Sequence, residues 1–400
     1  MVLTVREKGI PYLHAQSYVR AGDKSDVGFE VQAALRSPLG YGEHLKISSI
    51  TSAANNREYS AHLHVPNVGG DWTVTGRVGT EQQLSWITYQ QALQTVVVDY
   101  KPHIASAHQF SLEYALRNEI PNLPKTPQPI SGEGGGGGQL AALLAFDYSP
   151  ASSAVLNSAT ASLKSSLKHT FTALDQQKED GKIFVQTNVE LAGGLSASSA
   201  EFLKTDIHAK YERMLGPRLY GQPGLTVSLG GSVGVMYPLG LLVPWLSYHL
   251  SSTHPFASYL SDRYQLGGPL SLRGFAPAGT GPRVAGQTDS LGGDTRSSLL
   301  AMVSVPVPHA QLAASNLRAF AFCNLGSLGN SDYWRIQLAG GGLQGKYTPF
   351  FGYFRGSMGA GLSLSIGNHA RVEATYSYPF LKASHDMTRS FQVGIGVSLN

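Results

Sequence analysis

Strict alternation between apolar and polar or small residues constrains this chain more than any other feature. The last segment, 390–400, reads SFQVGIGVSLN, which places its apolar side chains on one face of a strand and its polar residues and glycines on the other. Segments 357–367 and 369–378 follow the same period. Because a period of two is typical of extended strands, these segments predict an antiparallel meander at the end of the chain.

The alternating segments are also long. Strands of about ten residues match the length needed to cross a bilayer with tilt, whereas globular strands are usually about five or six residues long. A soluble sandwich would show the same alternation, but the strand length favours a membrane barrel. The sequence therefore predicts an all-β fold, a transmembrane antiparallel β-barrel of about 16 strands. We expect these strands near 28–36, 43–53, 57–66, 71–80, 92–101, 107–118, 139–148, 159–173, 182–193, 201–212, 224–236, 291–306, 316–324, 356–366, 369–379 and 389–399.

Composition narrows the class of protein further. The charged fraction of 14%, the 46 glycines and the 19 tyrosines favour one large barrel over several soluble domains in these 400 residues. No apolar run approaches the length of about 20 residues that a spanning helix needs, which argues against a helical membrane protein. Cys323 is the only cysteine, so an intramolecular disulfide and a cysteine metal cluster are excluded. The net charge of +4 is weak and its lysines and arginines are scattered, so nucleic acid is not expected as a partner.

Three segments interrupt the strand pattern. Segment 119–138 is rich in proline and ends in a run of glycines, which predicts a low-complexity insertion. Segment 325–355 is rich in glycine and aromatic residues. Segment 237–290 is too long for a passive connection, because structureless loops beyond about 15 residues are uncommon unless they are functional. Residues 1–26 precede the expected barrel and carry neither a secretory signal nor an Arg-rich transit peptide.

Short motifs typical of enzymes occur by chance in this glycine-rich chain. Segment 230–234 fits the G-x-S-x-G nucleophile elbow, but it lies inside an alternating strand rather than at a turn from strand to helix. Segment 340–346 spells G-x-x-x-x-G-K, yet Tyr347 stands where a phosphate loop needs Ser or Thr. His62 and His64 share a strand face that could bind a metal, but we interpret them as lumenal or surface residues. We therefore predict no enzyme, no catalytic residue, no metal site and no cofactor.

The segment 266–275, LGGPLSLRGF, stands out within the longest interruption. It places Arg273 beside a glycine and an aromatic ring, on a loop too long for a simple connection. This combination suggests a loop tip that docks against a specific surface. About twenty residues later, Asp294 follows two glycines and offers a carboxylate as the docking partner.

The residues around Arg273 resemble the signature of the sixth loop in the outer-membrane barrel-assembly family. Over most of residues 27–400, the chain is similar to the mitochondrial branch of that family, the barrel subunit of the sorting and assembly machinery. Further similar segments are DRY at 262–264, LGGD at 291–294, FCNLG at 322–326, GNHARVEATY at 367–376, SLKSSLKH at 162–169 and VELAG at 189–193.

The resemblance implies that the long loop, 237–290, folds back into the barrel lumen. A guanidinium withdrawn from water there needs a carboxylate and further acceptors. Arg273 and its partners on the wall would then either take part in assembly or only brace the barrel. The loop motif consists of Gly267, Gly268, Arg273, Gly274 and Phe275. The expected partners on the barrel wall are Gly293, Asp294, Phe322, Asn324 and Gly326.

The resemblance also implies insertion and assembly of β-barrel precursor proteins into the mitochondrial outer membrane. The first and last strands would part laterally, and a client strand would pair with the exposed edge. Glycines in the last strand, and Pro38 and Gly40 after the first, would weaken this seam. The expected gate residues are Phe29, Val31, Ala33 and Leu35 in the first strand and Gln392, Gly394, Gly396, Val397 and Leu399 in the last.

Partners and domains follow from the same resemblance. The partners are β-barrel precursor proteins, accessory subunits of the assembly complex and membrane lipid. The family usually carries a soluble polypeptide-transport-associated domain before the barrel, which we expect at 27–400. Residues 1–26 are too short for such a domain, so either they hold its remnant or this branch lacks it. Two alternatives stay open: a protein-translocating or solute-conducting outer-membrane pore of the same family, and a soluble β-rich binding protein.

Overall fold

The computed structural model of the chain describes its strands and the connections that pack against them. The described residues are 12–20, 26–37, 42–52, 57–66, 68–81, 89–103, 106–121, 161–175, 181–193, 198, 200–219, 222–239, 260–283, 289–308, 316–329, 354–366 and 370–397. They include the short 3-10 helix η2 (Leu260–Asp262). No helix within these ranges is long and apolar enough to span a membrane.

The described structure is a single 16-stranded antiparallel sheet. Its strands are nine to fifteen residues long, apart from the last, which has seven. The strands are β1 (Tyr12–Arg20), β2 (Asp26–Arg36), β3 (His44–Ser52), β4 (Arg57–Val65), β5 (Asp71–Glu81), β6 (Tyr89–Lys101), β7 (His108–Pro121), β8 (Ala161–Asp175), β9 (Gly181–Ala192), β10 (Phe202–Leu215), β11 (Leu225–Pro238), β12 (Thr295–Pro306), β13 (Leu317–Gly329), β14 (Phe354–Ile366), β15 (Ala370–Leu381) and β16 (Phe391–Val397).

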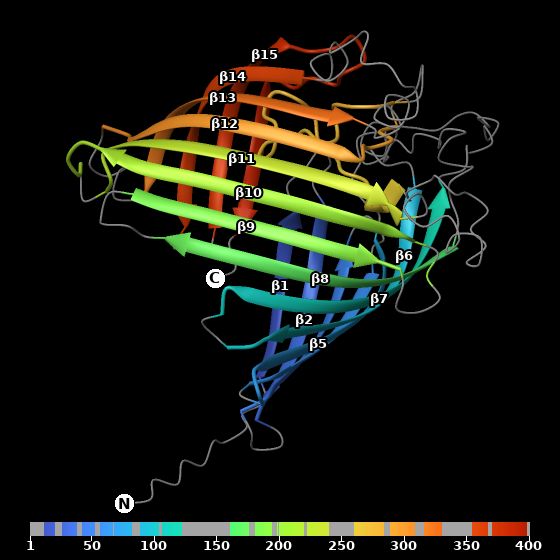
Figure 1. Ribbon diagram of the computed structural model, residues 1–400. Helices are drawn as coiled ribbons and strands as arrows, with labels where there is room; N and C mark the ends of the chain where they lie inside the picture. The colour runs from blue at the N-terminus through green and yellow to red at the C-terminus, as the bar shows by residue number, and fades with distance from the viewer. Residues whose placement is uncertain are drawn as a thin grey trace, which may run out of the picture.

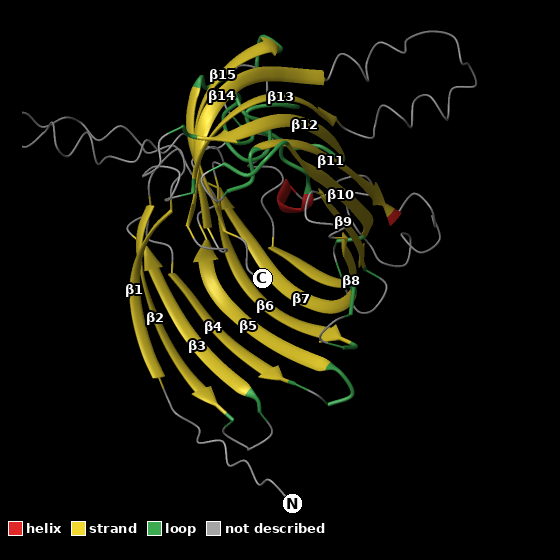
Figure 2. Ribbon diagram, turned by 90° about the vertical axis from the view of Figure 1, so that its left-hand side faces the viewer, coloured by secondary structure: helices red, strands yellow, loops and turns green. Residues whose placement is uncertain are grey.

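Each strand pairs with the next one along the chain. The sheet curves around a central space, the lumen, which loop segments enter (Figures 1 and 2). The predicted fold, an all-β antiparallel barrel of about 16 strands, is therefore confirmed. Among the described residues no backbone pairing joins β1 to β16, so the ladder ends at these two strands. We call this boundary the seam.

The first strand was predicted in the wrong place. β1 precedes the expected start of the barrel at residue 27 and pairs with β2 from Tyr12↔Ala34 to Arg20↔Asp26. Its sequence, YLHAQSYVR, does alternate, but Tyr12 and Tyr18 fall on the same face as the polar residues and obscure the period. Residues 12–20 therefore belong to the barrel sheet rather than to a separate N-terminal domain.

The expected strand at 139–148 lies outside the described residues, as does the turn at 367–368. β7 pairs directly with β8, so the total of sixteen is reached with β1 in the set instead. β7 extends to Pro121, which places the first residues of the expected insertion, 119–121, in a strand. Likewise β13 continues to Gly329, past the expected end of that strand at 324.

Side chains alternate between the two faces of the sheet as the period of two requires. In β15, Glu373, Thr375 and Ser377 are buried, whereas Tyr376 and Tyr378 on the opposite face are 69% and 67% exposed. The inward face is thus polar and the outward face apolar. This arrangement is typical of barrels that span a membrane, in which the outward side chains contact lipid.

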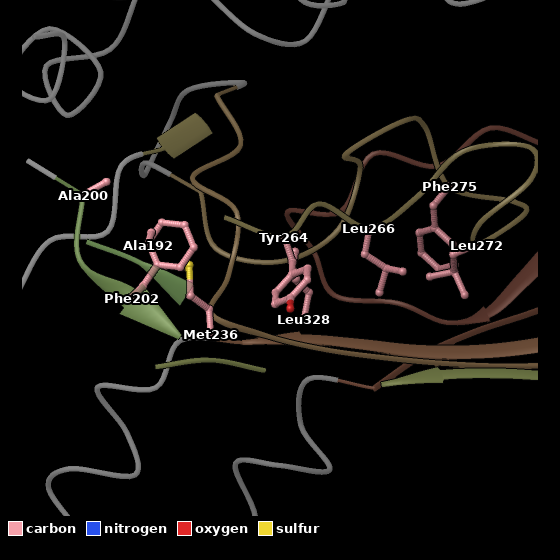
Figure 3. Close-up of a cluster of buried hydrophobic side chains, with 9 residues drawn as sticks. All are labelled: Ala192, Ala200, Phe202, Met236, Tyr264, Leu266, Leu272, Phe275 and Leu328. Atoms are coloured by element: carbon pink, nitrogen blue, oxygen red, sulfur yellow. The ribbon is translucent and has the colours of Figure 1, made fainter. Parts of the chain in front are cut away.

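The largest apolar cluster does not lie between two sheets but between the loop at 260–283 and the inner wall. Figure 3 shows its side chains in a row that runs from Ala200 at one end to Leu272 and Phe275 at the other. Strands β9, β10, β11 and β13 supply one side of this row, and the loop supplies the other. Its members are Ala192, Ala200, Phe202, Met236, Tyr264, Leu266, Leu272, Phe275 and Leu328.

Candidate functional site

Residues 260–283, here called the lumenal loop, are held in shape by their own backbone. Gly268 N donates to Phe275 O at 3.0 Å, which closes the segment that carries the motif. Gly267 has a φ of 126°, and a Cβ placed on it would lie 2.2 Å from Ala276 O. Only glycine allows this close approach in the left-handed region. The sequence LGGP therefore encodes a tight return of the chain rather than a flexible tip.

Arg273 is buried against three strands of the C-terminal wall, β13, β14 and β15. Its Nη2 lies 2.6 Å from an oxygen of Glu373, which β15 supplies. The guanidinium also lies over two rings of β13, with its carbon 5.1 Å from the centre of Phe322 and 5.7 Å from that of Phe320. Both charged residues are only 3% exposed. The arginine therefore forms a desolvated ion pair flanked by aromatic rings.

The backbone of Arg273 is bound as well as its side chain. Asn324 Nδ2 of β13 donates to Arg273 O at 3.4 Å, and the hydroxyl of Ser357 in β14 donates to the same oxygen. Gly326 contributes by lacking a side chain, because a Cβ there would lie 3.0 Å from Leu266 and 3.1 Å from Leu272. The loop is thus seated on the wall through both polar and apolar contacts.

The loop also holds the last strand. Gly274 N donates to Gln392 Oε1 at 2.9 Å, and Gln392 Nε2 donates to Phe275 O at 2.7 Å. One side-chain amide of β16 therefore satisfies a donor and an acceptor of the motif at once. Two residues later, a Cβ on Gly394 would lie 2.9 Å from Pro269 Cβ. Both inward positions of β16 that the structure places are thus in contact with the loop.

The connection between β15 and β16 pairs with the loop through its backbone. Ala276 N donates to Met387 O at 2.8 Å, Met387 N donates to Gly279 O at 2.9 Å, and Arg389 N donates to Gly274 O at 2.9 Å. Such a short ladder fixes the start of β16 against the loop. This contact could not be predicted from the sequence, because segment 382–390 shows no strand pattern.

Asp294 is not the carboxylate that pairs with Arg273, contrary to the expectation. Arg273 O binds Asn324, whose register partner on β12 is Leu300. Leu300 lies six residues beyond Asp294, or about 20 Å along an extended strand. Asp294 instead joins the edge of the sheet through its backbone, which bonds Met236 N and Gly329 O. Gly293 does meet the loop, through paired backbone bonds of 2.9 Å with Tyr264.

Glu373 was overlooked although a signal for it existed. It is the one carboxylate on the polar face of the alternating segment 369–378, and strands with that pattern turn this face inward. In the structure an oxygen of Glu373 also lies 2.8 Å from Arg371 Nε, which makes a second ion pair. Two arginines thus share one buried carboxylate at the tip of the loop.

The predicted gate residues of the first strand do not lie at the seam. Phe29, Val31, Ala33 and Leu35 belong to β2, which pairs with β1 on one side and β3 on the other. Phe29 and Leu35 are 53% and 41% exposed on the outer face. The unrecognised strand β1 displaced them from the edge.

The predicted gate residues at the end of the last strand are only partly described by the structure. Gly396 and Val397 pair with Arg371 and Ala370 at the end of β16. Leu399 lies outside the described residues.

Some of the enzyme-like motifs lie in described strands, and one lies outside the described residues. Segment 230–234 lies within β11, which is paired on both sides by β10 and β12. Segment 340–346 lies outside the described residues. His62 and His64 face the lumen, where each ring bonds a threonine hydroxyl of β5, at 2.9 and 3.2 Å. In the described ranges, no group of three or more His, Cys, Asp or Glu residues is arranged to hold a metal ion.

Comparison with known proteins places this architecture in a family. The model of the Omp85 superfamily domain matches residues 20–399 of the chain. Sorting and assembly machinery component 50 homolog B of Xenopus laevis is 31% identical over 255 residues, covering 62% of this chain and 48% of that protein. The human homolog is 29% identical over 255 residues, with the same coverage of 62% and 48%. The chain therefore spans about half the length of the curated relatives it matches.

Solved structures share the fold at low sequence identity. BamA from Haemophilus ducreyi lacking POTRA domains 1-3 has a TM-score of 0.63 at 12% identity, covering 98% of this chain and 70% of that one. CdiB from Acinetobacter baumannii has a TM-score of 0.51 at 11% identity, covering 98% and 60%. At such identities the likeness concerns the barrel architecture alone.

Proposed function

Because the chain belongs to the Omp85 superfamily, we propose that it inserts and assembles β-barrel precursor proteins by pairing their strands with its own seam. We place the barrel in the mitochondrial outer membrane, and its similarity to relatives named for the sorting and assembly machinery supports this. Its substrates are unfolded β-barrel precursors, and its partners are accessory subunits of the assembly complex. The process involves no covalent chemistry, so no catalytic residue or cofactor takes part.

The position of the last strand at the end of the ladder carries this proposal. Over the described residues β16 pairs with β15 alone, whereas an interior strand such as β11 pairs on both sides. A strand held on one side opens more easily than the interior strands. In a bilayer an exposed strand edge is costly, and an incoming strand would satisfy it. The seam can therefore open, and an incoming client strand is favoured there because it pairs with the exposed strand edge.

The lumenal loop controls how firmly β16 is held. Its contacts with Gln392 and Gly394 act on the inward side of the strand, where they leave the outer backbone edge free. Release of Gln392 would free β16 without breaking the wall to which Arg273 is bound. The loop is thus a latch for the last strand, and assembly requires it to close and reopen.

Glutamate in place of Gln392 is expected to loosen β16. A carboxylate still accepts from Gly274 N but cannot donate to Phe275 O, which leaves a buried carbonyl unpaired at a cost of about 1–3 kcal/mol. Hydrogen exchange of the amides in 391–394 should accelerate about tenfold. Gln186→Glu, on the inward face of β9, is the matched control and should leave that exchange unchanged. Equal exchange in the wild type and in Gln392→Glu would contradict the latch.

A cysteine in β1 is expected to form a disulfide with a cysteine placed in the final strand of an arrested precursor when a mild thiol oxidant is added. Ser17→Cys tests this in a Cys323→Ser background, since Ser17 lies on the strand that ends the ladder. Phe29 is its register partner on β2 and is separated from the seam by β1. Crosslinking, read on denaturing gels, should therefore appear with Ser17→Cys and be absent with Phe29→Cys.

The same experiment separates insertion from conduction. A passive pore would bring a passing polypeptide close to the lumenal loop, represented by Ser271→Cys at an exposed position of the loop, without contact to β1. Crosslinks confined to Ser271→Cys would sink the insertion proposal and favour a translocating pore of the same fold. Crosslinks to Ser17→Cys support strand pairing at the seam.

A further inference from the structure

Six charged side chains form a closed ring where the start of the lumenal loop meets the barrel wall. Cations and anions alternate around it, and each is bridged to its two neighbours. Strands β7, β8 and β9 supply five members, and the lumenal loop supplies the sixth through η2. In order, the ring is Arg117, Asp262, Lys164, Glu190, Lys168, Glu113 and back to Arg117.

Asp262 is the most deeply buried member of the ring. Its side chain is 2% exposed, and its Oδ1 accepts from Arg117 Nη1 at 2.8 Å and from Lys164 Nζ at 3.3 Å. Lys204 of β10 binds the same residue through its backbone, with Nζ 2.7 Å from Asp262 O. Burial by itself would raise the pKa of Asp262, but the charges of Lys164 and Arg117 lower it overall. The residue is therefore an anion held by three strands.

Without Asp262 the wall would be left with a charge imbalance. The five remaining members are three cations, Arg117, Lys164 and Lys168, and two anions, Glu113 and Glu190, a net charge of +1. An uncompensated charge in a buried site is strongly unfavourable. A negatively charged side chain is thus favoured at the position that η2 occupies, and Asp262 of the loop provides that charge.

We infer that Asp262 is a positioning residue that sets where the whole lumenal loop lies, independently of the arginine motif. Between Asp262 and Arg273 the side chains of Tyr264, Leu266 and Leu272 are buried against the wall, which links the position of one end of the segment to that of the other. Tyr264 lies under Lys204 Nζ, 4.4 Å from its ring centre, and under the guanidinium of Arg296 at 5.0 Å. Leu266 and Leu272 continue the apolar row toward the tip (Figure 3).

The loop is therefore a strut fixed at both ends. Its first end joins β7, β8 and β10 through Asp262, and its second end joins β13, β14 and β15 through Arg273. Because the first end is fixed, the part of the loop that contacts β16 stays at a constant position. This consequence for assembly rests on the proposed function, whereas the positioning of the loop does not.

The test measures thiol labelling of the loop tip in the complete chain in a bilayer, without any precursor. Ala276→Cys in a Cys323→Ser background places the thiol at a residue that is 4% exposed. Asp262→Asn is the main variant, because asparagine keeps the Oδ1 acceptor while removing the charge. We expect Asp262→Asn to raise the labelling rate of the thiol at least about tenfold. Glu58→Gln, which removes a carboxylate from the lumenal pair with Arg77, is the matched control and should not change that rate.

A second variant provides the same test if Asp262→Asn does not fold. Asp262→Asn with Lys164→Gln leaves two cations and two anions in the ring, so the wall is neutral again. We expect this double variant to fold and still to label rapidly, because the wall no longer selects the loop. Slow labelling in whichever of the two Asp262 variants folds would overturn the inference. Rapid labelling with normal precursor assembly would uphold it and count against the proposed role of the loop in assembly.

Discussion

Glutamine in place of Glu373 is expected to lower the free energy of unfolding by about 3–5 kcal/mol, because it leaves the Arg273 guanidinium buried without an anion. Arg273 is only 3% exposed, and its ion pair with Glu373 is the charge contact that the structure gives it. The measurement is the urea dependence of folding in lipid vesicles, read by gel mobility or tryptophan emission. A change below about 1 kcal/mol would contradict this expectation and show that water compensates for the lost carboxylate.

A paired replacement decides whether the arginine acts in assembly or only braces the barrel. Arg273→Met with Glu373→Met fills the site with apolar groups, and such exchanges of buried ion pairs are often neutral for stability. We expect near-normal stability but strongly reduced assembly of precursors in reconstituted membranes. Ion conductance should change less than assembly. Full assembly activity in the double variant would assign Arg273 a bracing role alone.

Alanine at Gly267 is expected to have the second largest effect. Its φ of 126° is unfavourable for a side chain, and the new Cβ would lie 2.2 Å from Ala276 O. The loop could not return on itself without moving that backbone, so the motif would lose its position beside β16. We expect a loss of several kcal/mol, consistent with a strained conformation and a steric clash together, and a collapse of assembly in the same reconstituted system.

Gly268 provides the matched comparison for Gly267. Its φ is 107°, but a Cβ there would meet only Pro277 at 3.6 Å, an ordinary contact. Gly268→Ala should therefore carry the cost of the backbone conformation, about 1–3 kcal/mol, and no clash. Equal effects of the two substitutions would mean that the close approach to Ala276 contributes nothing, contrary to this expectation.

Most of the fold could be predicted from the sequence, because each strand of a barrel carries its own local alternation of apolar and polar residues. Alternation over about ten residues predicted fifteen of the sixteen observed strands, including the whole C-terminal meander. β1 was missed because Tyr12 and Tyr18 accompany polar residues on one face. That single omission moved the predicted seam from β1 to β2, and with it the gate residues Phe29 and Leu35.

The candidate site was only partly readable from the sequence. The loop motif and the wall residues Phe322, Asn324 and Gly326 are brought together. The choice between Asp294 and Glu373 could not be made, because Arg273 and Glu373 are 100 residues apart and local patterns carry no information on such contacts. The ring around Asp262 is non-local in the same way, with partners up to 145 residues distant.

The contact between Gln392 and the loop also has a consequence for how this barrel is made. It joins residues 117 and 118 positions apart, so it can form only after the intervening strands have found their places. Contacts of such long range are slow to form, because the chain entropy of closing a large loop is lost before they contribute. The final strand is therefore expected to dock last during the barrel's own biogenesis, onto a surface that the middle of the chain has already prepared.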